Sequence, residues 1–163
     1  MRFSRYSVMA ATILGLGLAS FGSVAASAAP TIGAAAMAPV RVAMYTVTDY
    51  CDAHIWDGSA TQSPPNQAFW CIVQEGPARV FGGYTGPSDG VMGVNSWKGF
   101  QTFLKKEFGY QGVIDGYPGT ETYRAMQRYA AQNGYYTGVQ DGVMGPNSWS
   151  GLARNIQLNF FTN

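Results

Sequence analysis

The stretch DGVMGVNSWKGF, residues 89–100, returns later in the chain as DGVMGPNSWSGL, residues 141–152. Midway between them lies a diverged third copy, DGYPGTETYRAM, residues 115–126, and the three copies align without a gap at a constant period of 26 residues. A tyrosine and then a glycine precede each copy at the same distance: Tyr84 and Gly86, Tyr110 and Gly112, Tyr136 and Gly138. A fixed period of this size is typical of one supersecondary unit used repeatedly.

Each copy begins with an Asp-Gly step, which suits a tight turn. An aspartate side chain accepts hydrogen bonds from nearby backbone amides, and glycine adopts backbone conformations that other residues avoid. A second glycine can end the turn, and Pro146 directly after one of them fits the first position of a helix, where a missing amide costs nothing. The structural motif of the three copies comprises Asp89, Gly90, Gly93, Asp115, Gly116, Gly119, Asp141, Gly142 and Gly145.

The residues after each turn place apolar side chains at helical spacing. Positions three, seven and eleven residues after the first aromatic lie on one face of an α-helix. These positions are Trp97, Phe100, Leu104 and Phe108, then Tyr123, Met126 and Ala130, then Trp149, Leu152, Ile156 and Phe160. We therefore expect a mainly α fold, in which three turn-helix units bury their apolar faces against one another. Ser96, Thr122 and Ser148 fall in the first helical turns, where a hydroxyl can bond unpaired amides or the aspartate.

The pattern Asp-Gly-x-x-Gly-x-x-Ser/Thr-Trp/Tyr before an amphipathic helix resembles the peptidoglycan-binding domain of secreted bacterial cell-wall hydrolases. The resemblance covers about residues 83–160. It implies a small three-helix module that holds a protein on the peptidoglycan sacculus. The chain departs from the family in having three Asp-Gly units where members often have two. It also shows Phe103-Leu104 and Tyr129-Ala130 where the family helix often has Phe-Gln.

The first 28 residues have the pattern of a secretory signal peptide. Arg2 and Arg5 precede an apolar run from Val8 to Val24, and the small residues Ala26-Ser27-Ala28 fit a cleavage site. An uncleaved anchor is disfavoured because the run is short for a membrane span and small residues follow it. We therefore expect a signal peptide at residues 1–28 and a secreted protein, extracellular or cell-wall-associated, without a membrane span in its mature form.

Three segments follow the signal peptide. Residues 29–44 contain many small residues and prolines without an amphipathic period, which is typical of a flexible linker. Residues 45–82 have two β-branched and aromatic runs, MYTVTDYC and AFWCIVQ, on either side of a polar stretch with Pro64-Pro65. These runs favour two short β-strands. The periodic residues 83–163 form the expected repeat domain.

Cys51 and Cys71 are an even pair in a chain that we expect to be secreted. Oxidising compartments favour disulfides, and closing a loop of about twenty residues stabilises a fold by about 3 kcal/mol. We therefore expect a Cys51–Cys71 bridge. A reactive thiol, or a metal site that adds Asp52 and His54, would need free thiols, and the sequence lacks the paired ligand spacing of such a metal site.

The charge pattern argues against nucleic acid as a partner. Without Arg2 and Arg5, eight basic and nine acidic residues remain, and Lys105-Lys106 is the one basic cluster. Neutralising phosphates requires a surplus of Lys and Arg on one face. Recruitment to a membrane surface by charge is equally poorly supported.

The sequence also contains few residues that could catalyse hydrolysis. A Ser/His or Cys/His hydrolase needs a histidine base, and we interpret His54, three residues from a half-cystine, as a turn or surface residue. A zinc hydrolase would need several ligands at helix or strand spacing. A muramidase can work with two carboxylates, and four carboxylates lie outside the repeats: Asp49, Asp52, Asp57 and Glu75. Because residues 45–82 are a small platform for holding such a pair, we expect no enzyme and keep a small cell-wall hydrolase as the alternative.

The chemistry of peptidoglycan suggests which side chains bind it. Sugar rings and stem peptides present C–H faces, amides and hydroxyls, which suit exposed aromatic and amide side chains in a shallow groove. The candidate ligand-binding residues are Asn95, Tyr117, Tyr123, Tyr135, Tyr136 and Asn147. Trp97 and Trp149 fit the core better. Aromatic residues make up 14% of the chain, more than this core needs, which favours an exposed aromatic surface.

The sequence therefore predicts a secreted protein that binds peptidoglycan non-catalytically through three Asp-Gly turn-helix units, without a cofactor or metal. Either the glycan or the stem peptide can be the ligand. A third interpretation keeps the wall module as an anchor and assigns the binding of an unknown protein partner to residues 45–82.

Overall fold

The computed structural model describes residues 47–162, and this part of the chain is mainly helical, which confirms the expectation of a mainly α fold. The predicted signal peptide and linker lie outside the described residues. The helices are α1 (Asp49–His54), α2 (Gln67–Val73), α3 (Val94–Glu107), α4 (Thr120–Ala130) and α5 (Pro146–Phe160). Shorter turns are the 3₁₀ segments η1 (Ser59–Thr61) and η3 (Gln132–Gly134) and the π-helical segment η2 (Gln74–Ala78).

The two β-strands expected within residues 45–82 are a wrong prediction. The described residues contain no strand, and their one isolated β-bridge joins Val47 to Ser88. Thr48 caps α1 by accepting the Cys51 amide, and Asn66 caps α2 by accepting the Phe69 amide at 2.7 Å. An apolar run of this length fits a buried helix as well as a strand, so the caps on the flanking polar residues decide the outcome.

The predicted disulfide is present and joins α1 to α2. The two sulfurs of Cys51 and Cys71 are bonded, and their Cα atoms lie 5.4 Å apart. Both cysteines are fully buried. Neither sulfur is therefore left for the alternative thiol or metal site. By the loop-closure argument, a bridge across 20 residues stabilises the fold by about 3 kcal/mol.

The three longer helices begin directly after the second glycine of each sequence copy. Gly93, Gly119 and Gly145 are the N-cap residues of α3, α4 and α5, each with an extended backbone, and Pro146 is the first residue of α5. Proline suits this position because its fixed backbone angle matches a helix and its missing amide has no helical partner. The turn residues therefore set where each helix starts.

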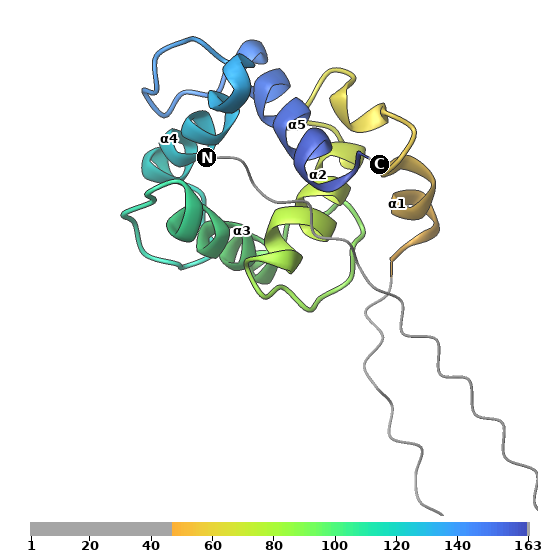
Figure 1. The fold of residues 1–163 in the computed structure, drawn as a ribbon. Coiled ribbons are helices and arrows are strands. Elements are labelled where there is room, and N and C mark those ends of the chain that lie inside the picture. Colours follow the sequence, from red (N-terminus) through yellow and green to blue (C-terminus); the bar gives the residue numbers. More distant parts are fainter. Residues whose placement is uncertain (1–46, 163) are drawn as a thin grey trace, which may run out of the picture. The chain divides into compact units, whose positions relative to one another are not determined.

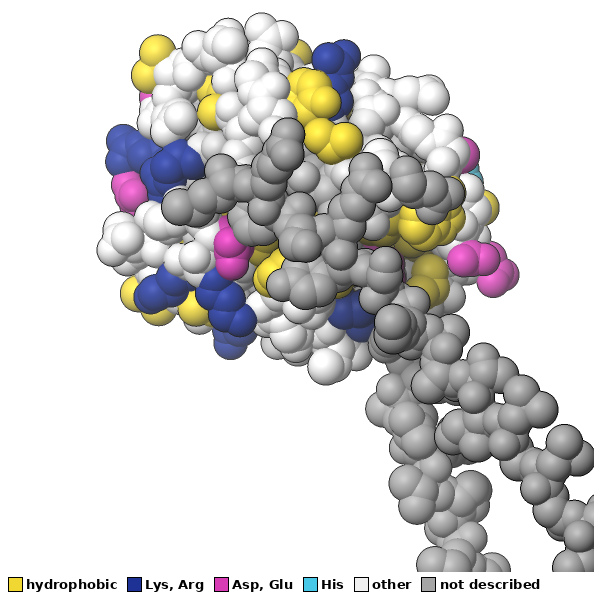
Figure 2. Space-filling view, viewed as in Figure 1, with side chains coloured by type: hydrophobic (Ala, Val, Ile, Leu, Met, Phe, Trp, Pro, Cys, Tyr) yellow, Lys and Arg dark blue, Asp and Glu magenta, His cyan; other side chains and the backbone are white. Residues whose placement is uncertain are grey.

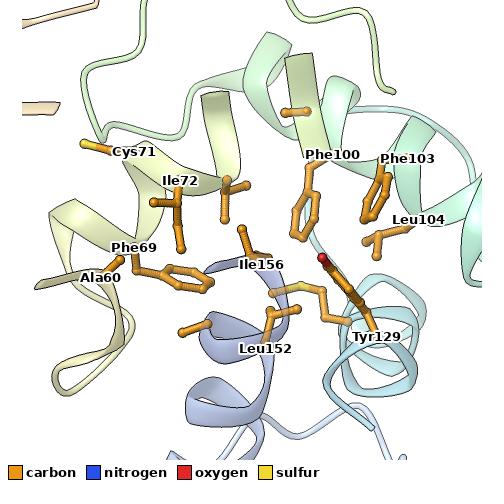
Figure 3. Packing of buried hydrophobic residues seen from close by; sticks show 14 of the residues in the cluster. Ala60, Phe69, Cys71, Ile72, Phe100, Phe103, Leu104, Tyr129, Leu152 and Ile156 are labelled. Carbon is orange, nitrogen blue, oxygen red and sulfur yellow. The ribbon is translucent and has the colours of Figure 1, made fainter. Parts of the chain in front are cut away.

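The helices surround a shared core (Figure 1), in which α3 packs on η2 and α4, α5 packs on α4 and α2, and α1 lies beside α2. Side chains from α2, α3, α4 and α5 point toward one another in this core (Figure 3). Its largest fully buried apolar members are Tyr129, Phe69, Phe100, Ile72, Leu104, Met126, Leu152 and Ile156. The core thus combines residues on both sides of position 82, where the sequence suggests a domain boundary.

The tryptophans of the first and third copies lie at the edge of this core. Trp97 and Trp149 are partly buried and pack around Trp70 of α2, with ring centroids 5.4 Å and 5.8 Å from it. This confirms their assignment to core packing. Within residues 47–162, no helix is long and apolar enough to cross a bilayer.

Candidate functional site

Three buried glutamines hold the three Asp-Gly turns. Gln74 in η2, Gln101 in α3 and Gln127 in α4 are fully buried. Each side-chain oxygen accepts the N–H of the turn glycine at 2.7–2.8 Å, and each side-chain nitrogen donates to the aspartate carboxylate at 3.0 Å. The same nitrogen also donates to the carbonyl two residues after the aspartate. Each turn is therefore bonded to the helix that precedes it, and the buried amide is satisfied.

The aspartates complete these turns from the solvent side. In every turn the carboxylate accepts the backbone N–H of the residue two positions later at 2.9 Å. Hydrogen bonds from the Tyr117 amide and from Gln101 lower the pKa of Asp115. The pKa of Asp141 is lowered most by the hydrogen bond from the Gln127 side chain and next by the hydrogen bond from the Val143 amide. Each of these carboxylates is therefore hydrogen-bonded within its own turn.

The tyrosine and glycine that precede each turn also act as a pair. Each tyrosine hydroxyl donates at 2.7 Å to the carbonyl three residues later, and the three tyrosines are Tyr84, Tyr110 and Tyr136. A Cβ at the glycine two positions after each tyrosine would lie 2.4–2.5 Å from that hydroxyl oxygen. Only glycine fits there without movement, so the loop folds tightly over the tyrosine ring.

Two open grooves lie between such a loop and the following helix. The first, here called the α3 groove, has a volume of about 320 Å³ and is lined by residues 82–86 with Asn95, Lys98, Gly99 and Thr102. The second, the α5 groove, has a volume of about 390 Å³ and is lined by residues 135–138 with Asn147, Ser150, Gly151 and Arg154. Every position that lines the α5 groove corresponds to one that lines the α3 groove two sequence periods earlier.

A helix glycine forms the floor of each groove. A Cβ at Gly99 would lie 2.9 Å from the Cβ of Tyr84, and a Cβ at Gly151 would lie 2.9 Å from the Cβ of Tyr136. The loop therefore rests directly on the helix, and the walls on either side of this contact are the side chains of the loop and of the exposed helix face. The two grooves share one construction.

The structure distributes the predicted ligand-binding residues over these grooves and the surface beside them. Asn147, Tyr135 and Tyr136 line the α5 groove together, and Asn95 lines the α3 groove at the position equivalent to Asn147. Two other candidates lie outside both sets of lining residues. Tyr117 is 68% exposed in the middle turn, and Tyr123 is partly buried, with its ring centroid 6.5 Å from that of Trp149.

The middle unit has the same glutamine-held turn and the same tyrosine bonded to its own loop, together called the frame here, but its surface differs. Ala125 stands where the outer units have Gly99 and Gly151. Arg128 lies against its own loop, donating from Nε to the Phe108 carbonyl at 2.6 Å and from a terminal nitrogen to the Gly109 carbonyl at 3.0 Å. Those loop positions correspond to Gly82 and Gly83, which line the α3 groove. In the middle unit a guanidinium thus covers the part of the loop that the α3 groove leaves open.

None of the four carboxylates considered for a muramidase lines either groove. Glu75 pairs with Arg79 at 3.1 Å and accepts a hydrogen bond from the Ser88 hydroxyl. Asp57 is exposed, accepts the Ser59 amide at 2.8 Å, and has its pKa lowered chiefly by hydrogen bonds from Ser59. A lowered pKa is opposite to what a general acid needs at neutral pH. None of the residues that line the two grooves is acidic.

His54 makes its contacts within its own helix. The His54 ring stacks on Tyr50 with centroids 4.2 Å apart, and its Nδ1 lies 2.8 Å from the Tyr50 carbonyl oxygen. The described residues contain no group of three or more His, Cys, Asp or Glu side chains arranged to hold a metal. Where Figure 2 shows the surface of the described residues, Lys and Arg side chains stand in small separate groups, some with acidic side chains beside them. A polyanion would need a continuous basic patch.

Comparison of the chain with known proteins gives no match to a family model, a curated protein or a solved structure. The function therefore has to be argued from the grooves themselves.

The glutamines are the main feature that the sequence interpretation missed. Each precedes its aspartate by 14 or 15 residues. Gln101 and Gln127 are one period apart, so a search for polar residues at that period could have found this pair, whereas Gln74 lies one residue out of register. The first repeat helix contains Phe100-Gln101, three residues before Phe103-Leu104, which is the step that the sequence analysis compared with Phe-Gln. One period after Gln127 the chain has Ala153.

Proposed function

We propose that the chain is a secreted, cell-wall-associated protein that binds peptidoglycan without cleaving it. In this proposal residues 83–163 form a three-helix, peptidoglycan-binding-like module of turn-helix units, and the α3 and α5 grooves are its binding surface. The sequence pattern of residues 1–28 supports secretion, and the turn-helix pattern supports the resemblance to wall-binding domains.

The observation that carries the proposal is the pair of equivalent open grooves. Their walls present amide, hydroxyl and backbone groups together with one cation each: Asn95, Thr85 and Lys98 in the first, and Asn147, Thr137 and Arg154 in the second. Such walls can hydrogen-bond a polar polymer with a repeating chemical unit. They lack the acid and base that would cleave it.

Sedimentation with purified, protein-free peptidoglycan sacculi tests this function. Residues 29–163 are incubated with sacculi, the pellet is assayed for protein, and the supernatant is assayed for muropeptides. We expect the protein in the pellet and no muropeptides released. Release that disappears in the Asp52→Asn or Glu75→Gln variant would instead establish the hydrolase, and protein that stays in the supernatant would contradict wall binding.

A further inference from the structure

We propose that the α3 and α5 grooves are two separate sites of one kind, each binding a carboxylate of the peptidoglycan stem peptide rather than the glycan strand. This inference rests on the proposed function and specifies its ligand. The two grooves have similar volumes and corresponding lining positions, and each carries one cation, Lys98 in the first and Arg154 in the second. A single chain would then bind two stem peptides.

The tyrosines of the grooves argue against a sugar ligand. Sugar binding by stacking needs an open aromatic face. Tyr84 is 8% exposed, its hydroxyl bonds the Pro87 carbonyl, and the Arg79 guanidinium carbon lies 5.4 Å from its ring centroid. Tyr135 is exposed in the α5 groove, but Gly83 stands at the equivalent position of the α3 groove. The two grooves therefore have no exposed aromatic ring in common on which a sugar could stack.

Each groove carries one exposed cation on its helix wall, although at positions one helical turn apart, because Ser150 corresponds to Lys98 and Thr102 corresponds to Arg154. Lys98 and Arg154 are exposed on the walls, and neither the Lys98 ammonium nor the Arg154 guanidinium has a hydrogen-bond partner among residues 47–162. No acidic side chain lines either groove, although the charge of Lys98 contributes the smallest share to the lowered pKa of Asp115. A carboxylate of the ligand would give each cation a charge-assisted hydrogen bond.

The other lining groups suit a peptide next to that carboxylate. Asn95 and Asn147 are exposed, and their amides can donate to a peptide carbonyl and accept from a peptide N–H at once. Thr85 and Thr137 add an exposed hydroxyl on the opposite wall. Stem peptides carry free carboxylates and peptide groups close together, whereas amino-sugar rings of the glycan present mainly hydroxyls and amides.

The middle unit shows that the fold does not require an open groove. It keeps the buried glutamine, the turn aspartate and the tyrosine hydroxyl bond, yet its arginine is bonded to the loop. The corresponding Arg154 of the third unit is left free of such bonds. The cation in each outer groove is therefore available to a ligand.

Isothermal titration calorimetry of residues 29–163 tests the inference with three soluble probes. These are the stem tetrapeptide L-Ala-γ-D-Glu-L-Lys-D-Ala, the same peptide with its carboxylates amidated, and peptide-free chitotetraose. We expect two sites per chain for the free peptide and at least tenfold weaker binding of the other two probes. The Lys98→Gln and Arg154→Gln variants should each leave one site, and the double variant none.

Lys105→Gln is the matched control, because it removes one charge from the exposed last turn of α3 outside the groove. It should retain both sites. Binding of chitotetraose in preference to the peptide, or two sites kept in the Lys98→Gln/Arg154→Gln variant, would overturn the inference. If the protein binds sacculi but does not bind the soluble peptide, and the variants bind sacculi normally, the proposed function stands and the stem peptide is excluded as the ligand. If the protein binds the peptide but not sacculi, the peptide site stands and wall binding is excluded.

Discussion

The outer units and the middle unit of residues 83–162 share one frame and differ in one surface. All three have the glutamine-held turn and the tyrosine bonded to its own loop. The outer units add an open groove over Gly99 and Gly151, whereas the middle unit has Ala125 and the loop-bound Arg128. The comparison teaches that the frame stabilises the fold and that the groove varies independently of it. Substitutions in the frame and in the grooves should therefore have separable effects.

The largest effect is expected from removing a buried glutamine. Gln127→Ala leaves the Gly142 amide without its acceptor and opens a cavity, so we expect a loss of about 4 kcal/mol in the free energy of unfolding. Gln140→Ala, at an exposed position in the next loop, should change it by less than about 0.5 kcal/mol. Urea denaturation measures both. Equal, small losses in the two variants would show that the glutamines do not hold the turns.

A turn glycine should show the next largest effect. Gly142 has φ +85°, and a Cβ there would lie 2.7 Å from the Thr120 carbonyl oxygen. Gly134 has φ +75° with no atom near an added Cβ. Gly142→Ala should therefore lose about 3 kcal/mol, from backbone strain and crowding together, and Gly134→Ala about 1 kcal/mol, from strain alone. Thermal and urea unfolding measure both variants. Equal losses of stability in Gly142→Ala and Gly134→Ala would contradict the close approach at Gly142.

Truncating the groove side chains should weaken binding with little change in stability. Asn95→Ala and Asn147→Ala remove exposed side chains without hydrogen bonds to the described residues, so each should change the free energy of unfolding by less than about 0.5 kcal/mol. Each should nevertheless weaken sedimentation with sacculi, and the double variant should weaken it most. Glu121→Ala, at the equivalent position of the middle unit, serves as the control and should leave sedimentation unchanged.

The smallest expected effect is on the loss of folding stability at acidic pH. The pKa values of Asp115 and Asp141 are lowered from 3.8 in the folded chain by hydrogen bonds to their carboxylates. Their contribution to stability is therefore complete above about pH 3.8 and is lost as the pH falls through their folded values. The Asp115→Asn/Asp141→Asn variant should show a shallower loss of stability between pH 4 and pH 2. An unchanged slope, measured by urea denaturation at each pH, would assign acid sensitivity to other carboxylates.

Much of the region after residue 82 could be predicted from the sequence. The apolar spacing of Trp97, Phe100 and Leu104 predicts a helix face, and the Gly-Pro step at 145–146 predicts where α5 begins. Hydropathy patterns report apolar faces, but they say nothing of a polar side chain that is buried with all its bonds made. The three glutamines were missed for that reason.

The structure of the region before residue 82 and the existence of the grooves were harder to predict from the sequence. Phe69, Cys71 and Ile72 form an apolar run whose composition fits a strand or a buried helix, and its helical form depends on the Asn66 cap and on packing against α5. The grooves arise from contact between a loop and a helix, so the sequence could supply Asn147 and Tyr136 as candidates without showing that they share a cavity. Lys98 and Arg154 gave no signal at all, because single surface cations are common.

An NMR titration of ¹⁵N-labelled residues 29–163 with soluble muropeptides tests the central claim most directly, because it locates the ligand. The account predicts shift changes at the amides of Thr85 and Asn95 in the α3 groove and of Thr137 and Asn147 in the α5 groove, with none at Gln111 and Glu121 in the middle unit. Changes of equal size in all three units, or changes confined to residues 47–62, would contradict the assignment of binding to the two outer grooves.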